Sequence, residues 1–142
     1  MTSDLGLLSC NCFATRQAAR SITRFYERHL TPTGLTSAQF GILSLLEETP
    51  SRPMGEMASV LGMQRTTLLR ALQPLQRDEL IESAAGQADP RQLLFSLSPT
   101  GRRKYRQARQ LWLKAQKEFE DKVGKQRAAR MRRDLLALSL DD

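Results

Sequence analysis

The fold of this chain is decided by residues 54–77, which read MGEMASVLGMQRTTLLRALQPLQR. Apolar side chains at the start of this stretch share one side of a helix, at Met57, Ala58 and Leu61. They predict a short helix over 54–61, and Gly62 ends it. A second helix must then begin within a few residues, so the two are joined by a tight turn.

That second helix is predicted from about Gln64 to Arg77. Its buried side carries Leu68, Leu72 and Leu75. Its other side carries Arg65, Thr67 and Arg70. Pro74 removes one backbone donor and should bend the last turn. The stretch therefore gives two helices, of which the second presents a polar and basic face.

Two more helices are predicted upstream. The first spans about Ser9 to Leu30, where one face recurs at helical steps at Ala14, Ala18, Ile22, Phe25 and His29. Pro32 and Gly34 end it. Thr36 and Gln39 have the spacing of a capping box, which starts a helix that runs to about Glu48. The segment 49–53, TPSRP, is a cluster of helix breakers.

Downstream, two strands are predicted at Leu80 to Ser83 and Gln92 to Leu97, joined as a hairpin by the loop 84–91. Ser98 and Pro99 then supply a cap and a first helical residue for a long basic helix. Gly124 interrupts this helix, and a last helix spans about Gln126 to Leu138. Within the long helix, an apolar seam with steps of three and four predicts packing against another helix, at Tyr105, Ala108, Trp112, Ala115 and Phe119.

Composition limits the classes of function. A chain of 142 residues fits one domain, and no apolar run approaches the roughly 20 residues of a membrane span. The formal net charge is +7. The segment 62–110 holds nine Arg/Lys and four Asp/Glu, which is +5 of that charge. A basic segment suits a polyanionic partner, although charge alone does not separate DNA from RNA or an anionic membrane surface.

The chain has few residues that could act in catalysis or bind a metal. The chain has two cysteines, Cys10 and Cys12, and one histidine, His29, which are too few for a structural zinc site. It has no Gly-rich phosphate loop and no suggestive pair of acids. We therefore expect no enzyme, no metal and no cofactor; the least implausible enzyme is a thiol oxidoreductase. The N-terminus carries an acid and no basic region, so we expect no secretory signal and a cytoplasmic, reducing location.

The order helix, short helix, turn, helix, hairpin is that of a winged helix-turn-helix. The motifs resemble the MarR family of transcription regulators over roughly Cys10 to Leu138. They are Leu35-Thr36-Ser37-Ala38-Gln39-Phe40-Gly41-Ile42-Leu43, Met57-Ala58, Leu61 to Leu68, Leu80-Ile81, Asp89-Pro90-Arg91 and Leu97-Ser98-Pro99-Thr100-Gly101. The resemblance implies a mainly α, single MarR-type domain over 1–142, with a DNA-binding lobe at about 35–100 and dimerisation helices at about 9–30 and 100–140.

The resemblance also implies that the helix from Gln64 is a recognition helix in the major groove of double-stranded DNA. Arg can bond two guanine acceptors there, and Thr can meet a base edge or a thymine methyl. Asp89 would hold the shape of the wing while Arg91 enters the minor groove. The predicted DNA-binding residues are Gln64, Arg65, Thr66, Thr67, Arg70, Asp89 and Arg91. The alternatives are an ordinary solvated helix face, a turn with a local ion pair, and a non-specific basic binding module.

Two positions depart from the family pattern. Gln64 stands where an acidic or Ser-type cap is common, which weakens the helix cap by up to about 1 kcal/mol. Glu79 stands where the family often has Gly before Leu-Ile. Neither change removes an expected arginine.

A homodimer on a pseudo-palindromic operator is predicted from the seam and from the apolar terminal helices. The alternative is that these faces pack only on the core of their own chain. The resemblance further implies a repressor released by a small aromatic or anionic ligand. Candidate ligand residues, by position, are Phe13, Arg16, Arg20, His29, Ser37 and Phe40.

Cys12 suggests a different signal. The pair Cys12-Phe13, with Tyr26 fourteen residues later, resembles the peroxide-sensing branch of the family, in which tyrosines hydrogen-bond an oxidised cysteine. A second expected tyrosine is Ser37 here, and Arg16 replaces another. Cys10 is expected to point about 200° away on the same helix, poorly placed for a disulfide with Cys12. The alternative is a small buried cysteine without a redox role.

Overall fold

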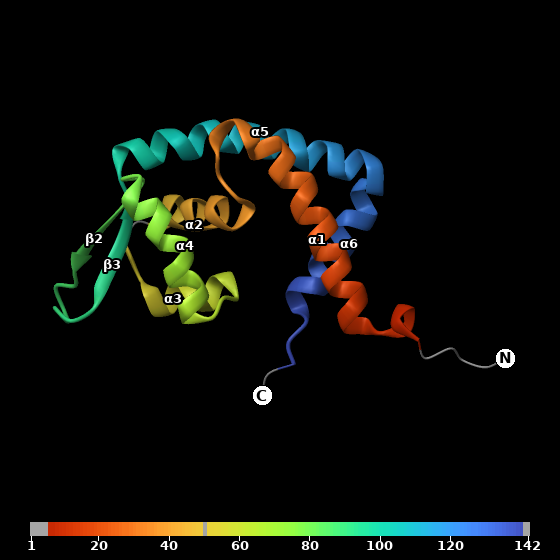
Figure 1. The fold of residues 1–142 in the computed structure, drawn as a ribbon, viewed down its shortest axis with the longest axis horizontal. Helices are drawn as coiled ribbons and strands as arrows, with labels where there is room; N and C mark the ends of the chain where they lie inside the picture. The colour runs from red at the N-terminus through yellow and green to blue at the C-terminus, as the bar shows by residue number, and fades with distance from the viewer. Residues whose placement is uncertain (1–5, 50, 141–142) are drawn as a thin grey trace.

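The computed structural model describes residues 6–49 and 51–140, so Pro50 of the predicted breaker cluster and the residues before Gly6 lie outside it. The elements, in chain order, are η1 (Leu7–Ser9), α1 (Asn11–Leu30), η2 (Thr31–Thr33), α2 (Ser37–Glu48), β1 (Arg52–Pro53), α3 (Met54–Leu61), α4 (Arg65–Arg77), β2 (Ile81–Ala85), β3 (Leu93–Leu97), α5 (Pro99–Val123) and α6 (Lys125–Ala137). Helix α5 runs along one edge of the molecule. The helices α2 to α4 and the strands lie beneath one of its ends, with α1 and α6 beneath the other (Figure 1). No helix in the described ranges is long and apolar enough to cross a membrane.

Local sequence explains most helix boundaries. The Thr36 hydroxyl accepts from the backbone N–H of Gln39, and the Gln39 side chain accepts from the N–H of Thr36, so the predicted capping box is confirmed. Gly62 ends α3 with a φ of +63°, a left-handed conformation that suits glycine. Gln64 precedes α4 without a side-chain cap bond, as its departure from the family pattern predicts.

The sheet has one strand more than the sequence predicts. Its order is β1-β3-β2, with both pairs antiparallel. The hairpin of β2 and β3 is confirmed, with Ile81 opposite Leu97. The segment 49–53 separates α2 from α3 as predicted, and it also holds the strand that was not predicted, because Arg52 pairs with Phe95 and Pro53 with Leu94. Proline is tolerated there, since β1 is an edge strand.

The core fills the space between α2, α3, α4 and the sheet. Its fully buried large side chains are Leu30, Ile42, Leu43, Leu46, Met57, Leu68, Leu72 and Leu75. Phe95 of β3 closes the core from the sheet. The leucines of α4 that the sequence assigns to a buried side are therefore confirmed. With that side fixed inward, the opposite side of α4 must face outward.

A tight junction ties the end of α4 to the start of α5. The Ser98 hydroxyl donates to the carbonyl of Glu79 at 2.6 Å and accepts from the N–H of Gly101 at 2.9 Å. A Cβ on Gly101 would lie 1.8 Å from the carbonyl oxygen of Leu80, so only glycine allows this approach. Glu79 has a φ of +58°, which explains why a glycine suits its position. Helices α4 and α5 are thus held together by close contacts of the backbone at Glu79 and Leu80 with Ser98 and Gly101.

The predicted apolar seam of α5 packs within its own chain. Tyr105 and Trp112 stack on Phe40 of α2, and Phe119 packs against Phe25 and Tyr26 of α1. The seam therefore serves the core of one chain, and it does not by itself support a dimer. Exposed leucines gather instead on η1 and near the C-terminal end of α6, while Val60, Leu69, Leu93 and Leu113 are single exposed apolar residues on other elements.

Candidate nucleic-acid interface

The outward side of α4 carries the predicted base-reading residues. Gln64, Arg65, Thr66, Thr67 and Arg70 are all exposed. Because Leu68, Leu72 and Leu75 face the core, Thr66 and Arg70 lie on the opposite side of the helix. A protruding helix with such a side fits the major groove of B-DNA.

Two further residues on this side were missed by the sequence prediction. Gln73 follows Arg70 by three residues and is exposed, so Thr66, Arg70 and Gln73 form one row. Leu69 is 41% exposed beside that row. Gln can bond both acceptor and donor of adenine, and an apolar side chain can meet a thymine methyl. The steps of four and three from Thr66 were the signal that would have found Gln73.

The tip of the wing has a defined shape. The Asp89 carboxylate accepts from the backbone N–H of Arg91 at 3.1 Å and lies 3.5 Å from its Nε. The Gly86 N–H donates to the carbonyl of Gln92 at 2.7 Å, and the Gln92 N–H donates to that of Asp89 at 3.0 Å. Asp89 thus occupies the position from which it can order the loop. The side chain of Arg91 is 93% exposed and projects from this ordered tip.

The positive charges near the start of α5 have different roles. Arg102 pairs with Glu47 of α2 at 3.1 Å, so it ties the long helix to the core. Arg103 donates to the hydroxyl of Thr100, and Arg106 is exposed. Within the described ranges, Arg65 and Arg70 have no ion pair. The free cations of this lobe therefore include those on the outward side of α4.

The predicted ligand residues fall into separate places. Ser37 and Phe40 line a mainly apolar cavity of about 400 Å³, together with Tyr26, Leu30 and Trp112. Three others, Phe13, Arg16 and Arg20, line a smaller hollow of about 240 Å³ at the start of α1. His29 lies in neither, and its Nε2 is 2.9 Å from a carboxylate oxygen of Glu118. One chain therefore does not bring the six together.

Polar side chains in the cavity of Phe40 and Trp112 are few: those of Tyr26, Ser37, Ser44 and Glu48. The backbone N–H and the hydroxyl of Ser37 donate to Glu27, at 3.0 and 3.3 Å. The Tyr26 hydroxyl donates to Gln116, and burial, followed by the charge of Glu120, raises the pKa of this tyrosine above 10. The aromatic faces of Phe40 and Trp112 suit an aromatic ligand, and the acidic side chain of Glu48 in the lining disfavours an anionic one.

Comparison with known proteins places the chain. The MarR family model matches residues 33–92. The transcriptional regulator MosR of M. tuberculosis, crystallised in complex with DNA, is 38% identical; the match covers 89% of this chain and 91% of MosR, with a TM-score of 0.81. The chain belongs to the MarR family. It is a DNA-binding transcriptional regulator with a winged helix-turn-helix, not an enzyme. No curated protein sequence matches it significantly.

Other MarR-like structures share the fold. A probable transcriptional regulator from Pseudomonas aeruginosa is 25% identical over 94% of this chain and all of that one, with a TM-score of 0.82. CouR from Rhodococcus jostii RHA1, crystallised with p-coumaroyl-CoA, is 18% identical over 96% of each chain, with a TM-score of 0.79. At that identity the likeness to CouR concerns the fold alone.

The cysteines of this MarR-family chain are both free and exposed. The prediction that Cys10 points away on the same helix is wrong, because Cys10 is the extended N-cap of α1 and its Sγ accepts from the N–H of Phe13 at 3.4 Å. Cys12 lies in the first turn of α1. Tyr26, fourteen residues later, is about 21 Å farther along the helix. A hydrogen bond between Cys12 and Tyr26 of one chain is thus excluded.

Proposed function

We propose that this protein is a sequence-specific repressor that acts in the cytoplasm and binds a pseudo-palindromic operator as a homodimer. The observation that carries the proposal is the row of Thr66, Arg70 and Gln73 on the outward side of α4, together with a wing whose tip presents the exposed guanidinium of Arg91. MosR, 38% identical, was crystallised with DNA, which supports the same partner here.

In this proposal the two elements read different features. Arg70 bonds guanine from the major groove, while Gln64, Arg65, Thr66 and Thr67 contact base edges or adjacent phosphates. Arg91 enters the minor groove, where a narrow A·T tract attracts a guanidinium. Asp89 orients the wing tip for that contact through its bonds to Arg91.

Exposed apolar surface on the terminal elements supports the homodimer. The helix α6 and the residues after it expose four leucines, Leu135, Leu136, Leu138 and Leu140, and η1 exposes Leu7 and Leu8. Exposed apolar groups gathered in this way mark an interaction surface. A second copy of the chain covers them, and its twofold axis places two copies of α4 on successive half-sites.

We further propose that an aromatic ligand releases the operator by occupying the cavity of Ser37, Phe40 and Trp112. This cavity lies where α1, α2 and α5 meet, so an occupant touches both the terminal helices and the DNA-binding lobe. CouR, a protein of the same fold, was crystallised with an aromatic thioester, p-coumaroyl-CoA. Phe13, Arg16, Arg20 and His29 stay predictions as ligand residues.

A selection experiment tests the main proposal. Duplexes enriched from a random pool by the purified protein are expected to converge on one pseudo-palindrome, which then stays bound against excess random DNA. Arg70→Ala should relax this preference at one position of each half-site, whereas Arg109→Ala, which removes an exposed charge from α5, should keep it. Failure of the wild type to enrich any sequence would contradict the proposal and favour a non-specific basic module.

A thiol signal is the second candidate, favoured by the exposure of Cys12 in the first turn of α1. The Cys12 thiolate attacks an organic hydroperoxide, forming a sulfenic acid and releasing an alcohol. Hydroperoxide should then weaken operator binding, dithiothreitol should restore it, and Cys12→Ser should stay bound. Equal DNA binding by the wild type and Cys12→Ser after oxidation would leave ligand release as the mechanism.

A further inference from the structure

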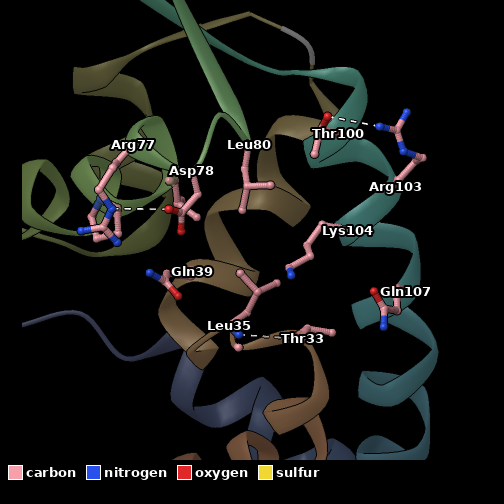
Figure 2. A pocket seen from close by; sticks show the side chains of 13 residues that line it. Thr33, Leu35, Gln39, Arg77, Asp78, Leu80, Thr100, Arg103, Lys104 and Gln107 are labelled. Atoms are coloured by element: carbon pink, nitrogen blue, oxygen red, sulfur yellow. Dashed lines mark hydrogen bonds and ion pairs between the residues drawn. The ribbon is translucent and has the colours of Figure 1, made fainter.

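A second cavity, of about 590 Å³, lies where the end of α4, the start of α5 and the turn before α2 meet (Figure 2). Its apolar wall includes Leu35, Leu75 and Leu80, which are buried side chains of the core. This volume falls within the range of roughly 300–1,000 Å³ that small-molecule sites occupy. The cavity is separate from the one around Phe40 and Trp112, and the two share no lining residue.

The charges of this cavity are mostly positive. Arg77 and Asp78 form a pair at 3.4 Å on one side, so the single carboxylate of the lining is offset by its neighbour. Arg103 donates to the Thr100 hydroxyl, so its guanidinium points toward Thr100 and away from the middle of the cavity (Figure 2). Lys104 is half-buried, and its side chain extends from α5 into the space between Leu80 and Leu35 (Figure 2). Within residues 6–49 and 51–140, no carboxylate pairs with Lys104.

We propose that this cavity binds a small organic anion, a carboxylate or a phosphate monoester attached to an apolar body. The ammonium group of Lys104 holds the anionic head, with Arg103 adding to the positive potential at the rim. The apolar body lies on Leu35, Leu75 and Leu80. The anion also supplies the counter-charge that Lys104 lacks, which is the main reason for an anion rather than a neutral ligand.

The DNA backbone is a poor candidate for this anion. The cavity is at the C-terminal end of α4, while Gln64 and Arg65 lie at the other end, about 20 Å away along a helix of this length. Its lining also contains the turn around Gly34, which precedes α2. A ligand here contacts the end of the recognition helix and the start of α5 together, without touching the groove-reading residues.

Amide resonances of the isotope-labelled full-length protein test the proposal. Phenylacetate and phenyl phosphate are titrated separately, and phenylacetamide, which has the same ring but no charge, is the control ligand. Both anions are expected to give saturable shifts at Gly34 and Leu80, and the amide should bind at least tenfold more weakly. Saturable shifts confined to other residues, or none at all with either anion, would overturn the site.

Four variants sharpen this test. Lys104→Gln should weaken binding of both anions at least fivefold, while Lys104→Arg, which keeps the charge, should bind within twofold of the wild type. Asp78→Asn should tighten binding two- to threefold, because it removes the one acid of the lining. Arg109→Gln, on α5 but outside the cavity, should change nothing. Equal weakening by Lys104→Gln and Arg109→Gln would show only general charge attraction and would refute the site.

Discussion

The DNA-binding lobe and the terminal helices both contain leucine-rich segments, but the two regions bury their leucines to very different extents. In the lobe, Leu43 and Leu68 are fully buried, since α2, α4 and the sheet cover one another. Near the C-terminal end of α6, Leu136 is 81% exposed and Leu138 is 65% exposed. The lobe therefore completes its core with its own chain, whereas the terminal region has apolar surface that one chain does not cover. An apolar periodicity alone cannot tell these situations apart.

The largest expected effect compares Leu43→Ala with Leu136→Ala. Leu43→Ala should lower the free energy of unfolding by about 2–5 kcal/mol, because it leaves a cavity in a closed core. This loss should not depend on protein concentration. At high protein concentration, Leu136→Ala should lower the free energy of unfolding by less than Leu43→Ala does. This loss should shrink as the protein is diluted, since the stabilisation that Leu136 contributes comes from a second copy. Urea denaturation at several protein concentrations measures both. If neither loss of unfolding free energy depended on protein concentration, Leu136 would not be stabilised by a second copy, and the two regions would not differ in this respect.

Leu136→Asp tests the same contrast through the assembly. A charge buried without a partner in an interface costs on the order of 3 kcal/mol or more, so the variant should sediment as a 16.1 kDa monomer at micromolar concentration while the wild type sediments as a dimer. Its far-ultraviolet circular dichroism should keep the helical signal of the lobe. Leu113→Asp, at a leucine of α5 that is also exposed, is the matched control and should remain dimeric. A monomeric wild type would refute the homodimer.

The third effect lies in α4, the proposed recognition helix. Arg70→Ala should weaken operator binding by about 1–3 kcal/mol and relax base preference at one position of each half-site, because a bidentate contact to guanine is lost. Titration of a set of single-base operator variants measures both quantities. Retained base preference with weaker binding would instead make Arg70 a phosphate contact.

Much of the lobe could be predicted because its signals are local. The capping box at Thr36, the glycine at Gly62 and the leucine spacing of α4 act within a few residues, and each is confirmed. Even the departure at Glu79 is informative, since its φ of +58° explains why glycine is usual there. The row of Thr66, Arg70 and Gln73, proposed here to contact bases, follows from the same helical spacing, although the prediction left out Gln73.

Features that depend on distant partners could not be predicted in this way. The strand β1 exists because β3, about forty residues later, offers an edge for Arg52 to pair with. The α5 seam contacts α1 and α2 of its own chain, which its spacing cannot reveal. The ligand residues were chosen by family position, and only the fold separates Ser37 and Phe40 from Phe13, Arg16 and Arg20.

The smallest predicted effect concerns the tip of the wing, residues 87–92, which are all exposed and, unlike α4, bury no apolar side. Among the residues that the structure describes, Arg91 pairs only with Asp89 of its own loop, and its side chain is 93% exposed. Removing it should leave the free energy of unfolding unchanged, since an exposed ion pair contributes little, about 0–1 kcal/mol. Arg91→Ala should therefore act on DNA binding alone.

In that variant, operator affinity should fall by about 1 kcal/mol on A·T-rich flanks and by less on G·C-rich flanks, because the narrow A·T minor groove holds the guanidinium more strongly. Binding of the wild type and Arg91→Ala to two operators that differ only in their flanks gives the comparison. Asp89→Asn, which keeps the shape of the side chain but weakens its hold on Arg91, should give a smaller loss with the same flank preference. Equal losses of Arg91→Ala on both flanks would mean that Arg91 contacts the phosphate backbone, and the wing would then position the protein on DNA without reading its shape.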